Sequence, residues 1–262
     1  MPIAEAVVPP KVWGKIRALS SASLSKAMGL IEGASWKDPK VDEGMSITTA
    51  VVEGSKNHAL KATMEIPYPI HCCFGALVAM NIDVDETNSQ ALRKSTLFRH
   101  ETLESPADAE AKRAYADYAQ QKTAQDFPEI KEISSVSQFV TTSPSAIVAH
   151  REFLTILNFR ELPRAEGRRR ILYSLMSPEL PELLALYSEP TKQEGWVRGV
   201  VHISAFLFEE TAPGSGKTAA TFVCHSDPMG KVPALIANSV IVNQAKSLLS
   251  IIKVIETGQV QK

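Results

Sequence analysis

The end of the chain, residues 194–261, constrains the fold more than any other segment. Residues 196–208 and 217–225 are rich in β-branched and aromatic residues and predict two strands. The turn Asp227-Pro228-Met229-Gly230 follows them, and residues 232–256 predict one long helix. Apolar side chains cover more than one side of this helix, so it needs a concave apolar surface to lie on. A curved antiparallel sheet provides such a surface and leaves space for an apolar ligand.

The order of the other predicted elements favours an α+β fold. Helices are expected at 11–31 and 70–80, with a hairpin at 45–53 and 58–66 between them. Ser105 and Pro106 have the residue types of a helix N-cap and first position. Further strands are expected at 132–142, 150–160 and 168–176, before the two near the end of the chain. Strands grouped in blocks are typical of an antiparallel sheet rather than a parallel, doubly wound one.

The composition is typical of one soluble domain. The 262 residues contain no Gly/Ser-rich or Pro-rich linker, and 44% of them are hydrophobic. We expect residues 1–40 to be a lead-in to a main body at 41–258, with a helical insertion at about 83–128. A formal net charge of −1 gives no reason to expect nucleic acid as a partner.

The cysteines and the hydropathy pattern bear on the compartment. The chain has only 3 cysteines, and two of them, Cys72 and Cys73, are adjacent. Such a set does not form a disulfide framework and is typical of a reducing compartment. No run of about 18 apolar residues predicts a transmembrane helix. We predict a cytoplasmic protein that contacts membranes transiently.

The first thirty residues allow two interpretations. No acidic residue lies between Glu5 and Glu32, while lysine, arginine and serine recur there, as in a mitochondrial presequence. Val12, Ile16, Leu24 and other apolar residues also recur at near-helical spacing. We favour an amphipathic helix of the folded domain over a targeting segment.

Three motifs resemble functional sites but lack the context that those sites need. Residues 213–218 resemble the end of a phosphate-binding loop, but β-like residues follow in place of a helix. His225-Ser226-Asp227 contains triad residue types, yet adjacent residues cannot adopt triad geometry. His71-Cys72-Cys73 lacks the spaced partners of a zinc site. We therefore predict a binding protein that is no enzyme and needs no metal or other cofactor.

The second half of the chain resembles the START family of lipid-transfer domains. His150-Arg151-Glu152-Phe153-Leu154 is similar to the Arg-Asp-Phe strand start of that family. Residues 195–199 (Gly-Trp-Val-Arg-Gly) resemble its Gly-x-Val-Arg strand, and residues 225–233 resemble the turn before its closing helix. The resemblance extends from about 132 to 257 and is looser over 40–82. It implies a helix-grip fold, in which a curved antiparallel sheet and a C-terminal helix enclose a lipid tunnel.

The predicted C-terminal helix carries an apolar stripe that we expect to face this lipid. The stripe consists of Ile236, Val240, Leu248 and Ile252, and Gln244 falls in its middle. Core packing is the simpler interpretation of such a stripe. A helix of this length, roughly 37 Å at ~1.5 Å per residue, favours a ligand-facing role for its middle. A buried amide needs a partner, so Gln244 is expected to contact a polar group of the lipid.

In sterol-binding members of the family, an acid and an arginine on neighbouring strands form a charged pair in the tunnel. An alignment without gaps places the acid position on Gln138 and the arginine position on Leu157. Loss of both partners is coherent, because either one alone would be an unpaired buried charge. We expect both residues, together with Val201 and Ile203, to line a more apolar tunnel that could hold a sterol, a carotenoid or an acyl lipid.

Two segments are expected at the tunnel mouth, in contact with a membrane. The resemblance places the loop at 161–167 there, followed by an arginine triplet that could meet anionic head groups. The basic residues are Arg164, Arg168, Arg169 and Arg170. Leu183 and Leu184 are the apolar residues of the second segment. Solvated strand ends and packing on the sheet are the alternative interpretations.

Together these features predict a carrier that binds a single hydrophobic lipid and transfers it between membranes. Its expected partners are the lipid and a transient membrane surface, with a monomer favoured. A lipid sensor that signals to a protein partner through residues 83–128 is the alternative. An acyl-thioester hydrolase is the third hypothesis, for which we find no set of acid, base and nucleophile.

Overall fold

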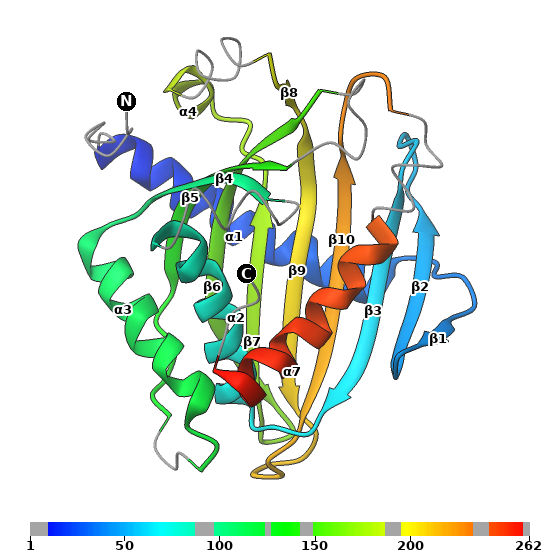
Figure 1. Cartoon of the computed structure of the whole chain (residues 1–262), viewed down its shortest axis with the longest axis vertical. Coiled ribbons are helices and arrows are strands. Elements are labelled where there is room, and N and C mark those ends of the chain that lie inside the picture. Colours follow the sequence, from blue (N-terminus) through cyan, green and yellow to red (C-terminus); the bar gives the residue numbers. More distant parts are fainter. Residues whose placement is uncertain are drawn as a thin grey trace.

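One large sheet, with helices on both faces, forms the body of the molecule (Figure 1). The structure is a computed structural model that describes residues 10–86, 97–123, 127–141, 149–186, 195–232 and 241–258. Its ten strands follow the order β1-β2-β3-β10-β9-β7-β6-β5-β4, and β8 pairs with β6 off this path. All neighbours on the path are antiparallel, and β8 is parallel to β6.

The strands are β1 (Lys40–Asp42), β2 (Met45–Val51), β3 (His58–Ile66), β4 (Leu97–Leu103), β5 (Ile133–Thr141), β6 (Arg151–Ala165), β7 (Arg168–Met176), β8 (Val197–Arg198), β9 (Val200–Glu210) and β10 (Thr218–Asp227). The helical elements are α1 (Pro10–Gly33), α2 (Ile70–Glu86), α3 (Pro106–Ala116), the 3₁₀ turn η1 (Asp117–Gln120), α4 (Pro181–Leu186), the 3₁₀ turn η2 (Gln244–Lys246) and α7 (Ser247–Thr257). The predicted α+β class and helix-grip fold are confirmed.

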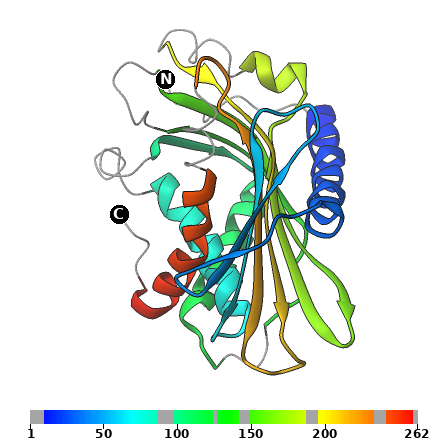
Figure 2. The ribbon, with the colours of Figure 1, turned by 90° about the vertical axis from the view of Figure 1, so that its right-hand side faces the viewer.

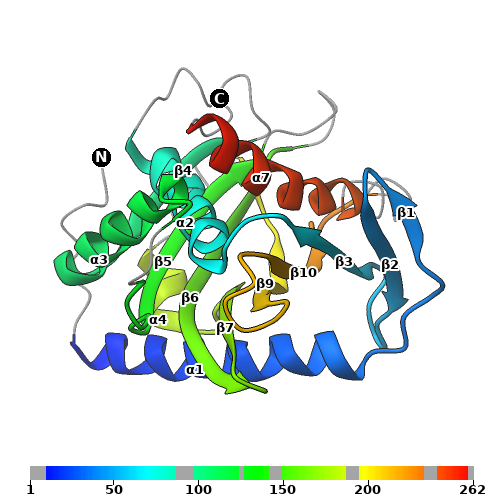
Figure 3. The ribbon, with the colours of Figure 1, turned by 90° about the horizontal axis from the view of Figure 1, so that it is seen from below.

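The two faces of the sheet carry different helices (Figures 2 and 3). We call the face under α2 and α7 the inner face and the face under α1 the outer face. The inner cluster joins side chains of α2, such as Phe74 and Leu77, to Leu248 and Ile251 of α7 and to Phe159 of β6. Strand residues alternate between faces, so the neighbours of Phe159 in β6 point toward α1.

The helix α1 packs on the outer face along one apolar stripe. Val12 and Ile16 lie in a cluster with Leu154 and Ile156 of β6. Leu24 and Ala27 lie in a second cluster with Ile203 of β9 and its neighbours. The first helix is therefore an amphipathic helix of the folded domain, as favoured from its spacing.

The segment at 83–128 is only partly the helical insertion that the sequence suggested. Ser105 caps α3 by accepting a 3.1 Å hydrogen bond from the backbone N–H of Asp108, as predicted. The helix ends at Ala116, and the chain continues as the 3₁₀ turn η1. The segment also contributes β4, which pairs with β5 at an edge of the sheet. Here strand pairing outweighs the polar, loop-like composition.

The single strand expected at 196–208 is divided into β8 and β9 at Gly199. A Cβ at Gly199 would clash with the ring of Phe153, so only glycine allows this close approach. The strand expected at 150–160 instead continues to Ala165, where Glu166 and Gly167 turn the chain with positive φ angles of 53° and 77°. The predicted loop at 161–167 is therefore mostly strand.

Candidate functional site

The inner face near the β6–β7 hairpin is filled by aromatic side chains. Phe74 of α2 packs edge-on against Phe159 of β6, with 5.2 Å between the ring centroids. Tyr115 of α3 lies 5.6 Å from Phe74 by the same measure. These rings are buried and join one core cluster with α7. This part of the inner face is core.

The buried stripe of the C-terminal helix differs from the predicted one. Its members are Ile241, Ala245, Leu248, Ile251, Val254 and Ile255. Leu248 is confirmed as buried, and Ile252 is only partly buried against the same cluster. Gln244 is exposed, so the prediction of a buried amide in the stripe is wrong. Gln244 opens the 3₁₀ turn η2, whose tighter winding shifts the phase that an uninterrupted 3.6-residue period assigns.

Two further residues of the predicted stripe, Ile236 and Val240, lie outside the described residues. Most of the first two turns of the helix expected from residue 232 also lie outside the described residues. The turn before it is described: the Asp227 carboxylate accepts a 2.7 Å hydrogen bond from the backbone N–H of Met229, and Gly230 has a φ of +67°. Arg151 of β6 donates from Nε to the carbonyl oxygen of Pro228 at 2.9 Å. These bonds fix the point from which the chain leads toward α7.

Away from the hairpin, the inner face is lined by small hydroxyl side chains. Leu157 belongs to the inner cluster, and its partner on β5 is Ser135. Two pairs further along, and so on the same face, Thr155 faces Ser137. All of these residues are buried. The Ser135 hydroxyl has no hydrogen-bond partner among the described residues. A buried hydroxyl without a partner is costly, so a group that bonds it would be stabilising.

Tyr173 and Asn81 add a polar pair to this surface. The Tyr173 hydroxyl donates a 3.0 Å hydrogen bond to the side-chain amide oxygen of Asn81, which links β7 to α2. Burial raises the pKa of Tyr173, so its hydroxyl remains protonated. Burial also raises the pKa of the Cys224 thiol on β10 to about 11. Neither side chain brings a charge to the inner face at neutral pH.

Around Ser135 and Leu157, the inner positions of the central strands carry no charged side chain, and the charged inner residues further along, Glu161 of β6 and Arg169 of β7, bind each other. On β6 they are Phe153, Thr155, Leu157 and Phe159, and on β9 they are Ser204, Phe206 and Phe208. On β5 they are Ile133, Ser135, Ser137 and Phe139. At these described positions the sheet therefore presents a neutral surface of apolar and hydroxyl groups.

Gln138 lies on the outer face, contrary to its expected place beside Leu157. Its partner on β6 is Leu154, three residues from Leu157, and an odd offset puts the two on opposite faces. Its amide donates a 2.9 Å hydrogen bond to the carboxylate of Glu152. Arg198 also binds this fully buried carboxylate, at 2.6 and 2.9 Å. A buried charged network therefore exists, but it is on the face that α1 covers.

The other predicted strand residues separate in the same way. Ile203 lies in the outer cluster under α1. Val201 is buried, and its backbone N–H donates a 2.9 Å hydrogen bond to the Ser177 hydroxyl. It lines a pocket on the outer side of the molecule. The structure thus brings Leu157 and Leu248 together and places Gln138 and Ile203 elsewhere.

The residues predicted at a common tunnel mouth lie at opposite ends of the sheet. The arginines flank the β6–β7 hairpin, at the bottom of Figure 1, and α4 with Leu183 and Leu184 lies at the top. Leu183 is fully buried in the cluster with Ile16 and Leu154, so its predicted exposure to a membrane is wrong. Leu184 is 36% exposed and Arg164 is exposed.

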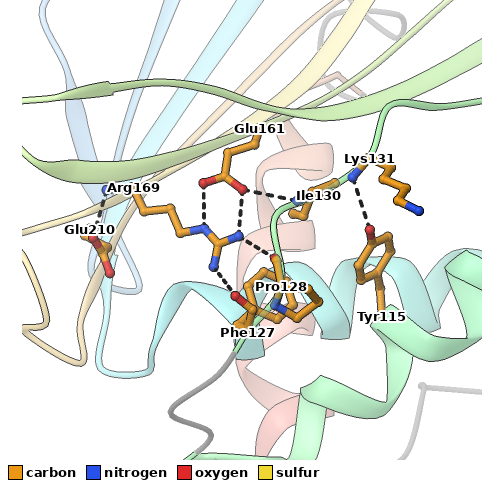
Figure 4. Close-up of polar contacts among 8 residues, drawn as sticks. All are labelled: Tyr115, Phe127, Pro128, Ile130, Lys131, Glu161, Arg169 and Glu210. Atoms are coloured by element: carbon orange, nitrogen blue, oxygen red, sulfur yellow. Dashed lines mark hydrogen bonds and ion pairs between the residues drawn. The ribbon is translucent and has the colours of Figure 1, made fainter.

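Arg169 is a buried structural residue, which corrects its predicted contact with head groups. Its guanidinium binds Glu161 through Nε and Nη2, at 2.8 and 2.6 Å (Figure 4). It also donates to the carbonyl oxygens of Phe127 and Pro128, at 3.0 and 2.5 Å. Its neighbours are also paired, Arg168 with the exposed Glu166 and Arg170 with the partly buried Glu209. A run of arginines in the sequence does not show which partner each one binds, because this depends on strand pairing and on distant carbonyl groups such as those of Phe127 and Pro128.

A pocket of about 460 Å³ opens on the outer side, between α1, α4 and the β8–β9 segment. Sequence reasoning missed it, because its walls come from four separate segments. Within the described residues, no group of three His, Cys, Asp or Glu side chains could hold a metal ion. No helix in this part of the chain is long and apolar enough to cross a membrane.

Comparisons with known proteins agree with this architecture. The family model of the START domain matches residues 119–252, more than half of the chain. The crystal structure of human STARD10 has a TM-score of 0.59 at 16% identity, covering 88% of this chain and 78% of that chain. Human StAR-related lipid transfer protein 5 has a TM-score of 0.60 at 14% identity, covering 94% and 98%.

A fragment of a STAR-related lipid transfer protein from Xanthomonas axonopodis is also similar, with a TM-score of 0.51 at 16% identity, over 86% of this chain and 100% of that chain. At these identities the likeness shows a shared fold. No curated protein sequence matches the chain.

Proposed function

Because this chain belongs to the START domain family, we propose that it binds one neutral lipid between the inner face of its sheet and α7, and transfers it between membranes. Family membership supports lipid binding in general. The surface described above supports the more specific proposal. Its apolar part includes Leu157 of β6 and Leu248 of α7, and its polar part includes Ser135 and Thr155.

The observation that carries the proposal is the Ser135 hydroxyl, which has no partner among the described residues and lies beside inner positions of β5 and β6 without charged side chains. A charged head group buried there would lose its hydration and find no opposite charge at the inner strand positions described above. A hydroxyl or ester group would instead complete the hydrogen bonding of Ser135 at little cost. A sterol, a hydroxylated carotenoid or a neutral acyl lipid fits this chemistry.

Transfer between membranes follows from the energetics of lipid burial. Burying roughly 400 Å² of apolar lipid surface contributes about 10 kcal/mol relative to water, at ~25 cal/mol per Å². The lipid tails of a membrane are also apolar, so exchange between protein and membrane is close to balanced. The rate is then set by opening of the helix and loops that cover the lipid. We propose no catalytic step, and an assay of acyl-thioester hydrolysis tests this.

The first experiment identifies the lipid and its polar contact. Mass spectrometry of lipids extracted from the purified chain gives the lipid class and the stoichiometry, with one neutral lipid expected per protein. Binding of cholesterol and of cholestane, which lacks the hydroxyl, is then compared. Ser135→Ala is expected to weaken cholesterol binding roughly fivefold, the size of one neutral hydrogen bond, and to leave cholestane binding unchanged.

Ser20→Ala provides the matched control for this variant. Its hydroxyl is also buried and has no partner within the described part of the chain, but Ser20 belongs to α1 on the outer side. The control should bind both sterols as the parent chain does. Equal effects of the two substitutions would show that the Ser135 hydroxyl is no ligand contact. Extracts containing only charged phospholipids would contradict the neutral-lipid proposal.

A lipid sensor is the second candidate, and one contact favours it. Gln120 of η1 donates a 2.8 Å hydrogen bond to the carbonyl oxygen of Val254 in α7. Movement of α7 upon lipid binding would therefore reach the α3–η1 surface, where a partner protein could respond. Vesicle-to-vesicle transfer separates the two functions, since a sensor retains its lipid and transfers little, whereas a carrier transfers it at a rate that rises with protein concentration.

A further inference from the structure

The pocket on the outer side, of about 460 Å³, lies away from the proposed lipid surface. Lys26 of α1, Met176 at the end of β7, Leu184 of α4 and Arg198 of β8 contribute to its walls. Leu154 forms part of the lining, and it belongs to the cluster under α1. The body of the sheet therefore separates this pocket from Leu157 and α7. Its volume lies within the range of ~300–1,000 Å³ found for small-molecule sites.

The pocket combines an apolar lining with donor groups. Leu154, Met176 and Val201 supply apolar surface. Lys26 supplies an ammonium group, which only donates hydrogen bonds. His202 also lines the pocket, and burial together with the Lys26 charge lowers the pKa of its imidazole, which is neutral at pH 7. Lys26 and His202 thus line the same pocket.

The acidic side chains around the pocket are bound by other residues, exposed to solvent or located on a neighbouring strand. Glu152 is fully buried, and its carboxylate is bound by Arg198 and Gln138. Glu179 lines the pocket and is exposed to solvent, so its charge is screened. Asp227 acts on His202 from β10, more weakly than Lys26 does. Lys26 and Arg198 are therefore the cations of the lining, and Arg198 binds Glu152.

We propose that this pocket is a second binding site, which takes a small amphipathic carboxylate. The carboxylate binds the Lys26 ammonium, with the His202 imidazole as a further donor. The hydrocarbon chain lies against Met176, Leu184 and Val201. The proposal is independent of the lipid on the inner face, because the two ligands occupy opposite sides of the sheet.

The methionine methyl groups distinguish the two sites in one experiment. Met176 lines the outer pocket, whereas Met64 and Met80 pack against the inner cluster. The full chain is labelled with ¹³C at its methionine methyl groups and titrated with octanoate, with Met176→Leu to assign one signal. Octanoate should shift the Met176 signal saturably and leave the Met64 and Met80 signals in place. Octan-1-ol, which has the same chain and no charge, should bind at least tenfold more weakly.

Substitutions at exposed positions test the charge. Lys26→Met should weaken octanoate binding on the order of tenfold, as expected for a hydrogen bond to a charged group. Arg17→Met removes a charge from an exposed position of the same helix outside the pocket lining, and should bind octanoate as the parent chain does. Glu179→Gln should strengthen binding roughly twofold by removing an exposed opposing charge.

Four outcomes would overturn the proposal. The Met176 signal could fail to saturate, octan-1-ol could bind as tightly as octanoate, or Lys26→Met could bind as the Arg17→Met control does. Shifts confined to Met64 and Met80 would also overturn it, since octanoate would then occupy the inner face. None of these outcomes bears on the binding of a neutral lipid there, which the extraction experiment tests separately.

Discussion

The Arg169–Glu161 ion pair offers the sharpest test of how this fold is held together. Both side chains are largely buried, with 10% and 11% of their surface exposed. Together they join the β6–β7 hairpin to the segment before β5, since Glu161 also accepts a 3.2 Å hydrogen bond from the backbone N–H of Ile130 (Figure 4). Arg169→Met removes the charge and keeps much of the side-chain volume.

The expected cost follows from what the substitution leaves behind. Glu161 loses two charge-assisted hydrogen bonds, and the carbonyl oxygens of Phe127 and Pro128 each lose one. The stacking of the guanidinium on the Phe127 ring, at 4.4 Å from the centroid, is also lost. Breaking a buried pair from one side costs about 3–5 kcal/mol of unfolding free energy. For a chain of this size, the melting temperature should fall by on the order of 10 °C.

Equilibrium denaturation with guanidinium chloride measures this cost. Arg168→Met is the matched control, because its partner Glu166 is 84% exposed and such surface pairs contribute about 0–1 kcal/mol. The double variant Arg169→Met/Glu161→Met should lose ~1–3 kcal/mol less than the sum of the single variants. If Arg169→Met and Arg168→Met destabilise equally, the buried pair does not stabilise the fold as argued.

Three further predictions concern packing, pH and thiol reactivity. Gly75→Ala should destabilise the fold by about 1–3 kcal/mol, because the new Cβ would lie 2.6 Å from the backbone nitrogen of Ala119. The control Gly14→Ala, which has open space around the new Cβ, should be neutral or stabilising. Equal melting temperatures of the two variants would refute the argument. The pKa of His225 is lowered to about 4 by burial, by the neighbouring His202 and by Lys26, whereas the unfolded chain has a histidine pKa of ~6.5. Between these two pH values unfolding takes up a proton, so the stability of the fold should decrease as the pH falls from about 6.5 to 4. In the variant His225→Gln, the unfolding free energy from denaturation curves should depend less on pH. An unchanged pH dependence would show that other groups cause it. Burial also raises the pKa values of the three thiols, Cys72, Cys73 and Cys224. A thiol reagent at pH 8 should therefore label the native chain far more slowly than the unfolded chain. Rapid labelling of the native chain would contradict the burial of these thiols.

The fold was largely predictable because its local signals agree with one another. The strand at 168–176 has the bounds expected from its composition, and the hairpin of β2 and β3 matches the predicted one closely. The Ser105 cap and the long first helix were visible as residue types at fixed spacing. Each of these features depends on residues that are near one another in sequence.

The candidate site was less predictable because it depends on strand register. An alignment without gaps put Gln138 and Leu157 at the two positions of a pair that lines the tunnel, yet the observed strand pairing puts them on opposite faces. Ile203 and Leu183 are apolar residues of the kind that also line ligand cavities, and their contact with α1 is set by tertiary packing. One signal was available: the apolar stripe of residues 11–31 showed that a helix would bury part of the sheet.

The C-terminal helix illustrates a different limit. Its apolar composition predicted a helix over the sheet, and α7 is there. The identity of the buried residues required the helical phase, which the 3₁₀ turn at Gln244–Lys246 changes. Composition therefore predicted the element, whereas local winding decided which side chains face the sheet.

The most direct test of the account is to locate a bound neutral lipid by photo-crosslinking. A sterol with a photoreactive group is bound to the full chain, crosslinked by light, and mapped by mass spectrometry of peptides. The account predicts saturable labelling on the inner positions of β5 and β6, such as Ser135 and Leu157, and on α7 near Leu248. Saturable binding with labels confined to α1 or to outer-face residues would contradict it.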